Sequence, residues 1–166
     1  MLVLGIDPGI AITGYGLVQA DEDGSIHAVD HGAILTDAGT PLPLRLEQLY
    51  HSLQEILQLH QPETSAVEKL FFVRNVKTGI AVGQARGVAL LALAQSHIGV
   101  AEYSPNEVKQ AVVGYGKAEK KQVQKMISVL LNLESIPHPD DAADALAVAI
   151  CHLHSTTTRN LYRTGS

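Results

Sequence analysis

The opening stretch MLVLGIDPGIAITGYGLVQADEDGSIHAVDHGAILT (residues 1–36) decides the fold class. Within it, residues 2–7 (LVLGID) form an apolar run that ends in a carboxylate, which is typical of a short buried strand, and a Pro-Gly pair then turns the chain. Residues 12–19 and 26–36 carry β-branched and apolar residues on either side of the turn sequence DEDGS, which predicts a hairpin. We therefore expect three antiparallel strands at the start of the chain.

Helices and strands alternate along the rest of the chain. Leucines at helical spacing, capping residues and short apolar runs mark the elements. This order indicates an α/β fold with a mixed five-stranded sheet, three antiparallel strands and then parallel ones, flanked by helices. We expect residues 1–154 to form one domain and the polar tail 155–166 to fray. In order, the predicted elements are a helix over 43–60, a strand over 64–68, a helix over 76–97, a strand over 100–103, helices over 105–113 and 118–131, and a last helix from Asp140 or Asp141 to near His152.

Composition narrows the class of protein. The chain has 166 residues, of which 46% are hydrophobic and 17% charged, so it can bury the core of a single domain. Its one cysteine excludes a disulfide framework and a cysteine-based zinc site. The N-terminal residues lack the basic region of a signal peptide, and the apolar runs fall short of the ~20 residues of a membrane helix. We expect a cytoplasmic protein.

The charges are unevenly distributed along the chain. The net charge is −5, yet residues 69–125 hold nine of the twelve basic residues and only three acidic ones. A basic face on an otherwise acidic domain is suited to a phosphate backbone. The alternative is a solvated helix face, which we prefer for residues 117–125 taken alone. The nine basic residues are Lys69, Arg74, Lys77, Arg86, Lys109, Lys117, Lys120, Lys121 and Lys125.

Four carboxylates stand where a folded domain has no structural need of them. Asp7 and Glu68 each end a predicted buried strand, and Asp141 and Asp144 lie three residues apart in the helix start DDAADALAVA. If the two strands are neighbours, Asp7 and Glu68 emerge side by side at one edge of the sheet. Residues at i and i+3 share one face of a helix, so the two aspartates can converge on a single point.

Converging carboxylates repel one another unless cations lie between them. Hard oxygen ligands suit Mg²⁺ or Mn²⁺, and two such ions about 4 Å apart can clamp the attacking and leaving oxygens of a phosphoryl displacement. Simpler explanations exist for Asp141, as a helix cap or first-turn acid, and for Asp7, as a turn residue. Glu68 and Asp144 have none, because apolar residues surround them. Spacing alone does not decide whether Asp140 or Asp141 pairs with Asp144.

Several segments together resemble the RuvC family of Holliday-junction resolving endonucleases. The resemblance implies an RNase H-like fold and a homodimer that nicks four-way junction DNA with Mg²⁺ or Mn²⁺, two ions in each active site. It also implies that the acidic tetrad is Asp7, Glu68, Asp141 and Asp144, because the D-A-A-D spacing selects Asp141 over Asp140. The segments, which run in family order from Leu2 to about His154, are GIDPG, TGYG, AVEKLFF, GQARG, EVKQAVVGYGKAEKKQVQ and DDAADALAVAICH.

Basic and aromatic side chains near these acids are expected to bind DNA. By the resemblance, Lys109 and Lys120 occupy positions of functionally important lysines, and Phe71 occupies the position of an aromatic residue that contacts junction bases. An aromatic residue beside cations is also suited to stacking an unpaired base, whereas we expect Phe72 in the core. The expected DNA contacts are Phe71, Arg74, Lys77, Arg86, Lys109, Lys117, Lys120 and Lys121.

Three glycines four residues apart, Gly79, Gly83 and Gly87, lie on one face of the helix predicted over 76–97. Each costs about 1 kcal/mol relative to alanine in a helix, so a close backbone neighbour is expected to compensate. That neighbour is the domain's own sheet, which we favour, or the twin helix of a homodimer. A two-fold dimer suits two symmetric cuts.

These observations predict a crossover junction endodeoxyribonuclease of DNA recombination and repair. We expect it to hydrolyse paired phosphodiester bonds of a four-way junction, leaving 5′-phosphate and 3′-hydroxyl ends, and the resemblance implies cooperation with the RuvA–RuvB branch-migration complex. The first alternative is an RNase H-like nuclease of the YqgF type that acts on RNA. A second alternative is the ATP-binding actin and Hsp70 superfold, but that fold places two such domains around its nucleotide and 166 residues supply only one. A third is a junction-binding protein without activity, which has no use for Glu68 and Asp144 together.

Overall fold

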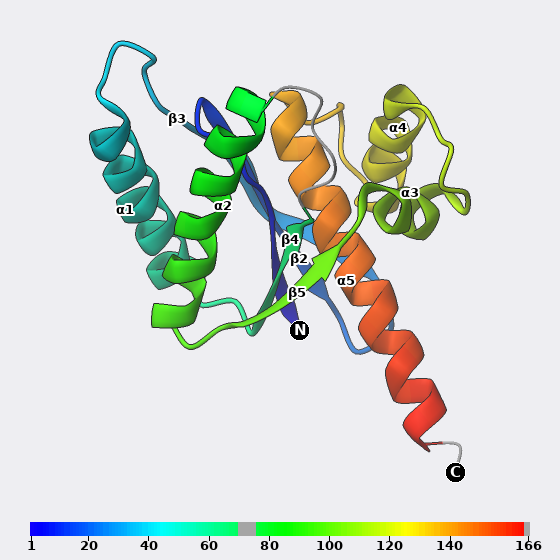
Figure 1. Cartoon of the computed structure of the whole chain (residues 1–166). Coiled ribbons are helices and arrows are strands. Elements are labelled where there is room, and N and C mark those ends of the chain that lie inside the picture. The colour runs from blue at the N-terminus through cyan, green and yellow to red at the C-terminus, as the bar shows by residue number, and fades with distance from the viewer. Residues whose placement is uncertain (70–75, 165–166) are drawn as a thin grey trace.

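The chain folds into a five-stranded mixed sheet with helices on both faces, as the computed structural model in Figure 1 shows. The structure describes residues 1–69 and 76–164, with side chains described up to Thr156. The strands are β1 (Leu2–Asp7), β2 (Ile12–Ala20), β3 (Ile26–Leu35), β4 (Thr64–Glu68) and β5 (Gly99–Tyr103). The helices are α1 (Leu42–His60), α2 (Val76–Gln95), α3 (Pro105–Val113), α4 (Lys120–Leu130) and α5 (Asp140–Thr164).

The sheet has the order β3-β2-β1-β4-β5, so the first strand of the chain lies at its centre. β1 pairs antiparallel with β2, and β2 antiparallel with β3. On its other side β1 pairs parallel with β4, and β4 pairs parallel with β5. The predicted fold class, three antiparallel strands followed by parallel ones, is confirmed.

Each face of the sheet carries its own core. Successive side chains of a strand point to opposite faces, so Leu4 and Ile6 pack with α1 and α2, whereas Val3 packs on the other side. There α5 lies directly on β1 and β2, and α3 and α4 pack against α5 (Figure 1). Both faces of β1 are therefore buried, which explains the nearly continuous apolar sequence of this strand.

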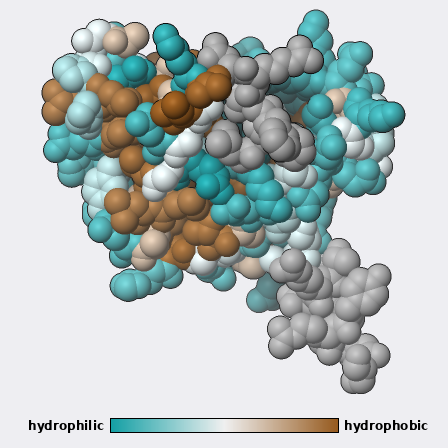
Figure 2. All heavy atoms as spheres, viewed as in Figure 1, coloured by the Kyte–Doolittle hydropathy of each residue, from teal (hydrophilic) through white to brown (hydrophobic). Residues whose placement is uncertain are grey.

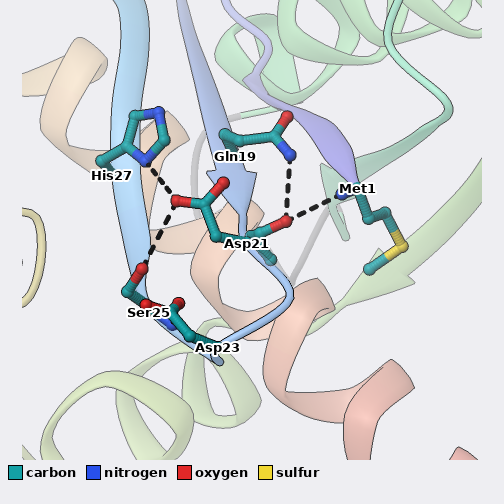
Figure 3. A network of polar contacts seen from close by, with 7 residues as sticks. Met1, Gln19, Asp21, Asp23, Ser25 and His27 are labelled. Atoms are coloured by element: carbon teal, nitrogen blue, oxygen red, sulfur yellow. Dashed lines mark hydrogen bonds and ion pairs between the residues drawn. The ribbon is translucent and has the colours of Figure 1, made fainter.

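Local polar contacts fix the hairpin turn between β2 and β3. This turn lies beside the first residues of β1, at the other end of the strand from Asp7. The Asp21 backbone N–H donates to the Ser25 carbonyl over 2.9 Å, and the Ser25 N–H donates to the Asp23 carboxylate over 2.9 Å. His27 Nδ1 lies 3.1 Å from Asp21 Oδ2, and the Met1 amine donates to the carbonyl of Ala20 (Figure 3). The turn predicted from DEDGS is thus confirmed.

The helix limits agree with the sequence except at the C-terminus. At the start of α3, Ser104 and Glu107 form a reciprocal capping box. The prediction that the last helix ends near His152 is wrong, because α5 continues to Thr164. The hydroxyls of Ser155 and Thr156 donate back to the carbonyls of residues 151 and 152, so these polar side chains are satisfied within the helix. The division into a domain of residues 1–154 and a C-terminal tail stays a prediction.

Candidate active site

Two carboxylates end neighbouring parallel strands at one edge of the sheet. Ile6 of β1 pairs with Val67 of β4, so the next residues, Asp7 and Glu68, leave the sheet side by side. Both line a cavity of about 170 Å³. The expectation that these strands are neighbours is therefore confirmed.

Helix α5 brings further acids to the same edge. It begins at Asp140 and crosses β1 and β2, which places its first two turns beside the end of β1 (Figure 1). Asp144 lines a cavity of about 210 Å³ together with Glu68, Lys109 and Lys120. Side chains that are far apart in the sequence, Glu68, Lys109, Lys120 and Asp144, thus lie together at this end of the sheet.

The close approach of α5 depends on glycines in the strands beneath it. Gly14 pairs with Asp7 across β1 and β2, and a Cβ atom on Gly14 would fall on the backbone carbonyl group of Asp141, closer than the 3.0 Å that real Cβ atoms keep. The same is true of Gly5 against Ala145. Gly14 is thus a residue of the site that the sequence analysis missed as such. The only signal for it was the TGYG segment, because a glycine inside a strand marks a close backbone approach.

Burial, and then mutual repulsion, raises the pKa values of Asp7, Glu68 and Asp144. The pKa of Asp7 rises from 3.8 to about 7, because the carboxyl is buried and lies near Glu68, Asp144 and Asp141. Burial also raises the pKa of Glu68, with Asp144 adding to the effect. The pKa of Asp144 is raised by burial and by the neighbouring aspartates, against the opposing effect of Lys120. These acids therefore form one electrostatic unit.

Two lysines partly offset this negative charge. Lys120 Nζ donates to Asp144 Oδ2 over 2.9 Å and lies 3.2 Å from Asp140 Oδ2. Lys109 lines the same cavity as Glu68 and lowers the pKa of that residue. Asp140 also accepts a hydrogen bond from Gln124, so its carboxylate is engaged by α4.

The donor set fits a hard divalent cation, although it is not a ready-made metal centre. In the part of the chain that the structure describes, no three His, Cys, Asp or Glu side chains are arranged to hold an ion. However, the candidate ligands are all carboxylates, and the burial of Asp7 among other acids is destabilising unless a cation or a proton compensates. Carboxylate oxygens suit Mg²⁺ or Mn²⁺.

Without metal, the protein is expected to lose stability between about pH 4 and pH 8. In this range the folded state keeps a proton on Asp7 that the unfolded state has released, so raising the pH favours unfolding. A pKa change of this size corresponds to on the order of 4 kcal/mol, or about 10 °C in melting temperature for a chain of this length. Glu68 and Asp144, whose pKa values are also raised, act in the same direction.

Thermal unfolding in EDTA at pH 5, 6, 7 and 8 measures this effect. Asp7→Asn should flatten the profile and stabilise the metal-free protein at pH 8, since the amide carries no charge. A melting temperature that is constant or rises from pH 5 to pH 8 would contradict the proposed electrostatics.

The predicted DNA contacts are distributed unevenly around the acids. Lys77 lines a cleft that reaches Asp141. Arg86 faces the cavity of Asp7 and forms an ion pair of 2.6 Å with Glu102, whereas Lys117 lines a separate cavity between α3 and α5. Lys121 is exposed on α4. Phe71, Phe72 and Arg74 lie outside the described residues. The DNA-binding roles of all these residues stay predictions.

Comparison with known proteins identifies the relatives of this fold and site. The family model described as crossover junction endodeoxyribonuclease RuvC matches residues 3–152. The chain belongs to the RuvC family. The RuvC protein of Syntrophomonas wolfei is 58% identical over 155 residues, which cover 93% of this chain and 90% of that protein. The RuvC protein of Chloroflexus aggregans is 57% identical over 95% of this chain and 96% of its own length.

Solved structures of other proteins share the architecture. T. thermophilus RuvC in complex with a Holliday junction substrate aligns with a TM-score of 0.87 and 32% identity, covering 95% of this chain and 96% of that one. The yeast mitochondrial Holliday junction resolvase Ydc2 aligns with a TM-score of 0.71 at 16% identity, which indicates a common fold alone. The resemblance to RuvC inferred from the sequence motifs is thus confirmed.

Proposed function

We propose that this RuvC-family protein resolves four-way (Holliday) DNA junctions by paired, symmetric, metal-dependent hydrolysis of phosphodiester bonds, in recombination and repair. One observation carries the proposal: Asp7, Glu68, Asp141 and Asp144 come from three separate segments to one edge of the sheet. The relative from T. thermophilus, which was solved with a Holliday junction substrate, has the same architecture. We further propose that the cuts leave 5′-phosphate and 3′-hydroxyl ends.

The four carboxylates would hold two Mg²⁺ or Mn²⁺ ions, which supply an activated water and stabilise charge on the leaving oxygen. Asp7 lies at the centre of the group, since Glu68, Asp144 and Asp141 all act on its pKa. Lys109 and Lys120 place positive charge on one side of the carboxylates, where they can bind the phosphate group and stabilise the charge that develops on it. These residues therefore orient the scissile phosphate toward the acids.

Selection of the junction would depend on its backbone shape. Lysines that contact phosphates position a nucleic acid without reading its sequence. Lys77 lies on the Asp141 side of the carboxylates, and Lys109 and Lys120 lie on the Glu68 and Asp144 side. A DNA strand that passes between Lys77 on one side and Lys109 and Lys120 on the other would meet the carboxylates midway. We also expect cooperation with the RuvA–RuvB branch-migration complex, by family resemblance.

We propose that the enzyme is a homodimer joined through the outer face of α2. Val76, Ile80 and Leu91 lie on this face and are 73%, 57% and 52% exposed. Figure 2 shows hydrophobic residues gathered on the side of the molecule where α1 and α2 lie. A Cβ atom on Gly87 would meet nothing within 4 Å, so the domain's own sheet does not require this glycine. A close partner helix would explain it.

The same helix could also be considered as a membrane-spanning segment. Of the helices in the described residues, only α2 is long and apolar enough to cross a membrane, by length and composition alone. In this fold α2 packs on α1 and contacts β5, and its own residues Ala85, Ala89 and Leu93 are buried. A second copy of the chain is the occupant that suits a two-fold symmetric substrate.

Ile80→Glu is expected to convert the dimer into a monomer, because it places a charge in the centre of the apolar face. Sedimentation velocity measures the change, and we expect the dissociation constant to rise at least 100-fold. Leu59→Glu is the matched control, since this leucine is 77% exposed at the end of α1. A dimer that survives Ile80→Glu would place the interface elsewhere.

The function is tested by cleavage of an end-labelled immobile four-way junction, beside linear duplex and structured RNA. We expect nicks on two opposed strands of the junction with Mg²⁺ or Mn²⁺, none with EDTA, and products that DNA ligase can reseal. Cleavage of RNA alone would instead support an activity of the YqgF type. Junction binding without cleavage under any metal would refute the proposed enzyme.

A further inference from the structure

A second cleft adjoins the carboxylates on the side away from Lys109 and Lys120. It has a volume of about 530 Å³ and lies between residues 9–12, which are the connection from β1 and the first residue of β2, and the first two turns of α2. Asp141 forms one of its edges. The volume is in the range of pockets that enclose a small organic molecule, and is too small for a duplex.

The cleft lies at the start of α2, where the helix is not packed closely against the residues that face it. Further along the helix, Ala85, Ala89 and Ala92 of the same face are buried against the core. Over residues 77–82 the helix instead faces the connection between β1 and β2 and the first residue of β2 across the cleft. The small side chain of Ala81 leaves the intervening space open, although Leu is also a strong helix former.

The chemistry of the walls matches one unit of a DNA strand. Ile10, Ile12, Ala81 and Val82 give apolar walls, which suit the flat face of a base and the carbon atoms of a deoxyribose. Lys77 contributes a positive charge to the same cleft, and Asp141 connects it to the acids that act on the phosphate. An apolar pocket with a cation beside it and a catalytic carboxylate at its edge suits a nucleoside flanked by phosphates.

We infer that this cleft receives the nucleotide next to the scissile phosphate on the cleaved strand. The inference rests on the proposed function and adds a subsite that contacts a base. Its lining is mainly apolar, with Thr78 as the one uncharged polar side chain, so selection would act chiefly through size and apolar contact. Ala81 is the residue that sets the available depth.

Site-directed disulfide cross-linking tests whether a base occupies the cleft. The single native cysteine, Cys151, is buried, so a cysteine introduced by Ala81→Cys is the reactive thiol. The probe is a four-way junction with a thiol tether on one base, placed in turn at each position around the cut, with EDTA to prevent cleavage. We expect at least tenfold more cross-linking with the base next to the scissile phosphate than with any base in the arms.

Gln58→Cys is the control, because Gln58 is exposed near the end of α1, away from both the cleft and the outer face of α2. Equal yields for Ala81→Cys and Gln58→Cys, or no preference among tether positions, would overturn the inference. Cleavage of the same junction by the unmodified protein with Mg²⁺ tests the proposed function separately. If that cleavage occurs while the cross-link does not, the subsite alone is refuted.

A second measurement uses Ala81→Leu, which fills the cleft while keeping a strong helix-forming residue. Cleavage of a pool of junctions randomised around the cut should show a change of about tenfold in base preference at the position next to the cut, the size expected for a few methylene groups in an apolar pocket. Gln58→Leu, at an exposed position of α1, should reproduce the profile of the unmodified protein. An unchanged profile for Ala81→Leu would contradict the assigned role.

Discussion

Asp7→Asn is expected to abolish junction cleavage while leaving junction binding within a few-fold of the unmodified protein. Asp7 lies where the effects of the other three carboxylates meet, so an amide there removes a ligand and a charge from the centre of the group. We expect the cleavage rate to fall by roughly a thousandfold or more, since the ion-held water and the leaving oxygen both depend on this site. Single-turnover cleavage and a gel-shift assay with Ca²⁺ measure the two properties separately.

Asp37→Asn is the matched control for this charge change. Asp37 lies in the loop between β3 and α1, where its carboxylate accepts from the backbone N–H of Gly39, a contact that asparagine can keep. This variant should cleave as the unmodified protein does. Equal losses of binding and cleavage in Asp7→Asn, or retained cleavage, would count against Asp7 as the central ligand.

Gly14→Ala is expected to have the second largest effect, although the residue carries no functional group. The added methyl group would collide with the backbone of Asp141, and backbone can relieve the clash only by moving the start of α5. Displacing a group by about 1 Å in an active site can reduce the rate about 100-fold. We expect a comparable loss of cleavage, together with about 1–3 kcal/mol of stability from overpacking.

Gly99→Ala separates this effect from a general intolerance of alanine. A Cβ atom at Gly99 would meet nothing within 4 Å, at the start of β5. This variant should retain both stability and cleavage. Circular dichroism and urea unfolding would establish that Gly14→Ala still folds, and a folded Gly14→Ala protein with full activity would show that α5 does not need this close approach.

The strands and half of the candidate site could be predicted from sequence because their signals are local. Residues 2–7 and 64–68 each change from apolar to acidic at the last position, and the structure ends β1 and β4 there. Two such strands in parallel bring their last residues together, so the pairing of Asp7 with Glu68 follows from topology. The capped start of α3 at Ser104 is similarly local.

The contribution of α5 could not be predicted from spacing, because it depends on how a helix crosses the sheet. Without the family resemblance, spacing left the choice between Asp140 and Asp141 open. In the structure Asp140 is held by Lys120 and Gln124 of α4, whereas the backbone of Asp141 lies on Gly14. Apart from the resemblance, tertiary packing is what distinguishes the two aspartates. The end of α5 was missed for a different reason: serine and threonine hydroxyls can be satisfied inside a helix as well as in a frayed tail.

The position of β1 at the centre of the sheet has a consequence for synthesis on the ribosome. The hairpin strands that pair with one side of β1 emerge directly after it, but the other side stays open until residue 68 has been made. Asp141 and Asp144 emerge later still, with the helix that covers the opposite face of the same strand. A nascent chain released early therefore carries an open strand edge, which is prone to aggregation, and lacks half of its acids. Completion of the fold and acquisition of nuclease activity become a single event.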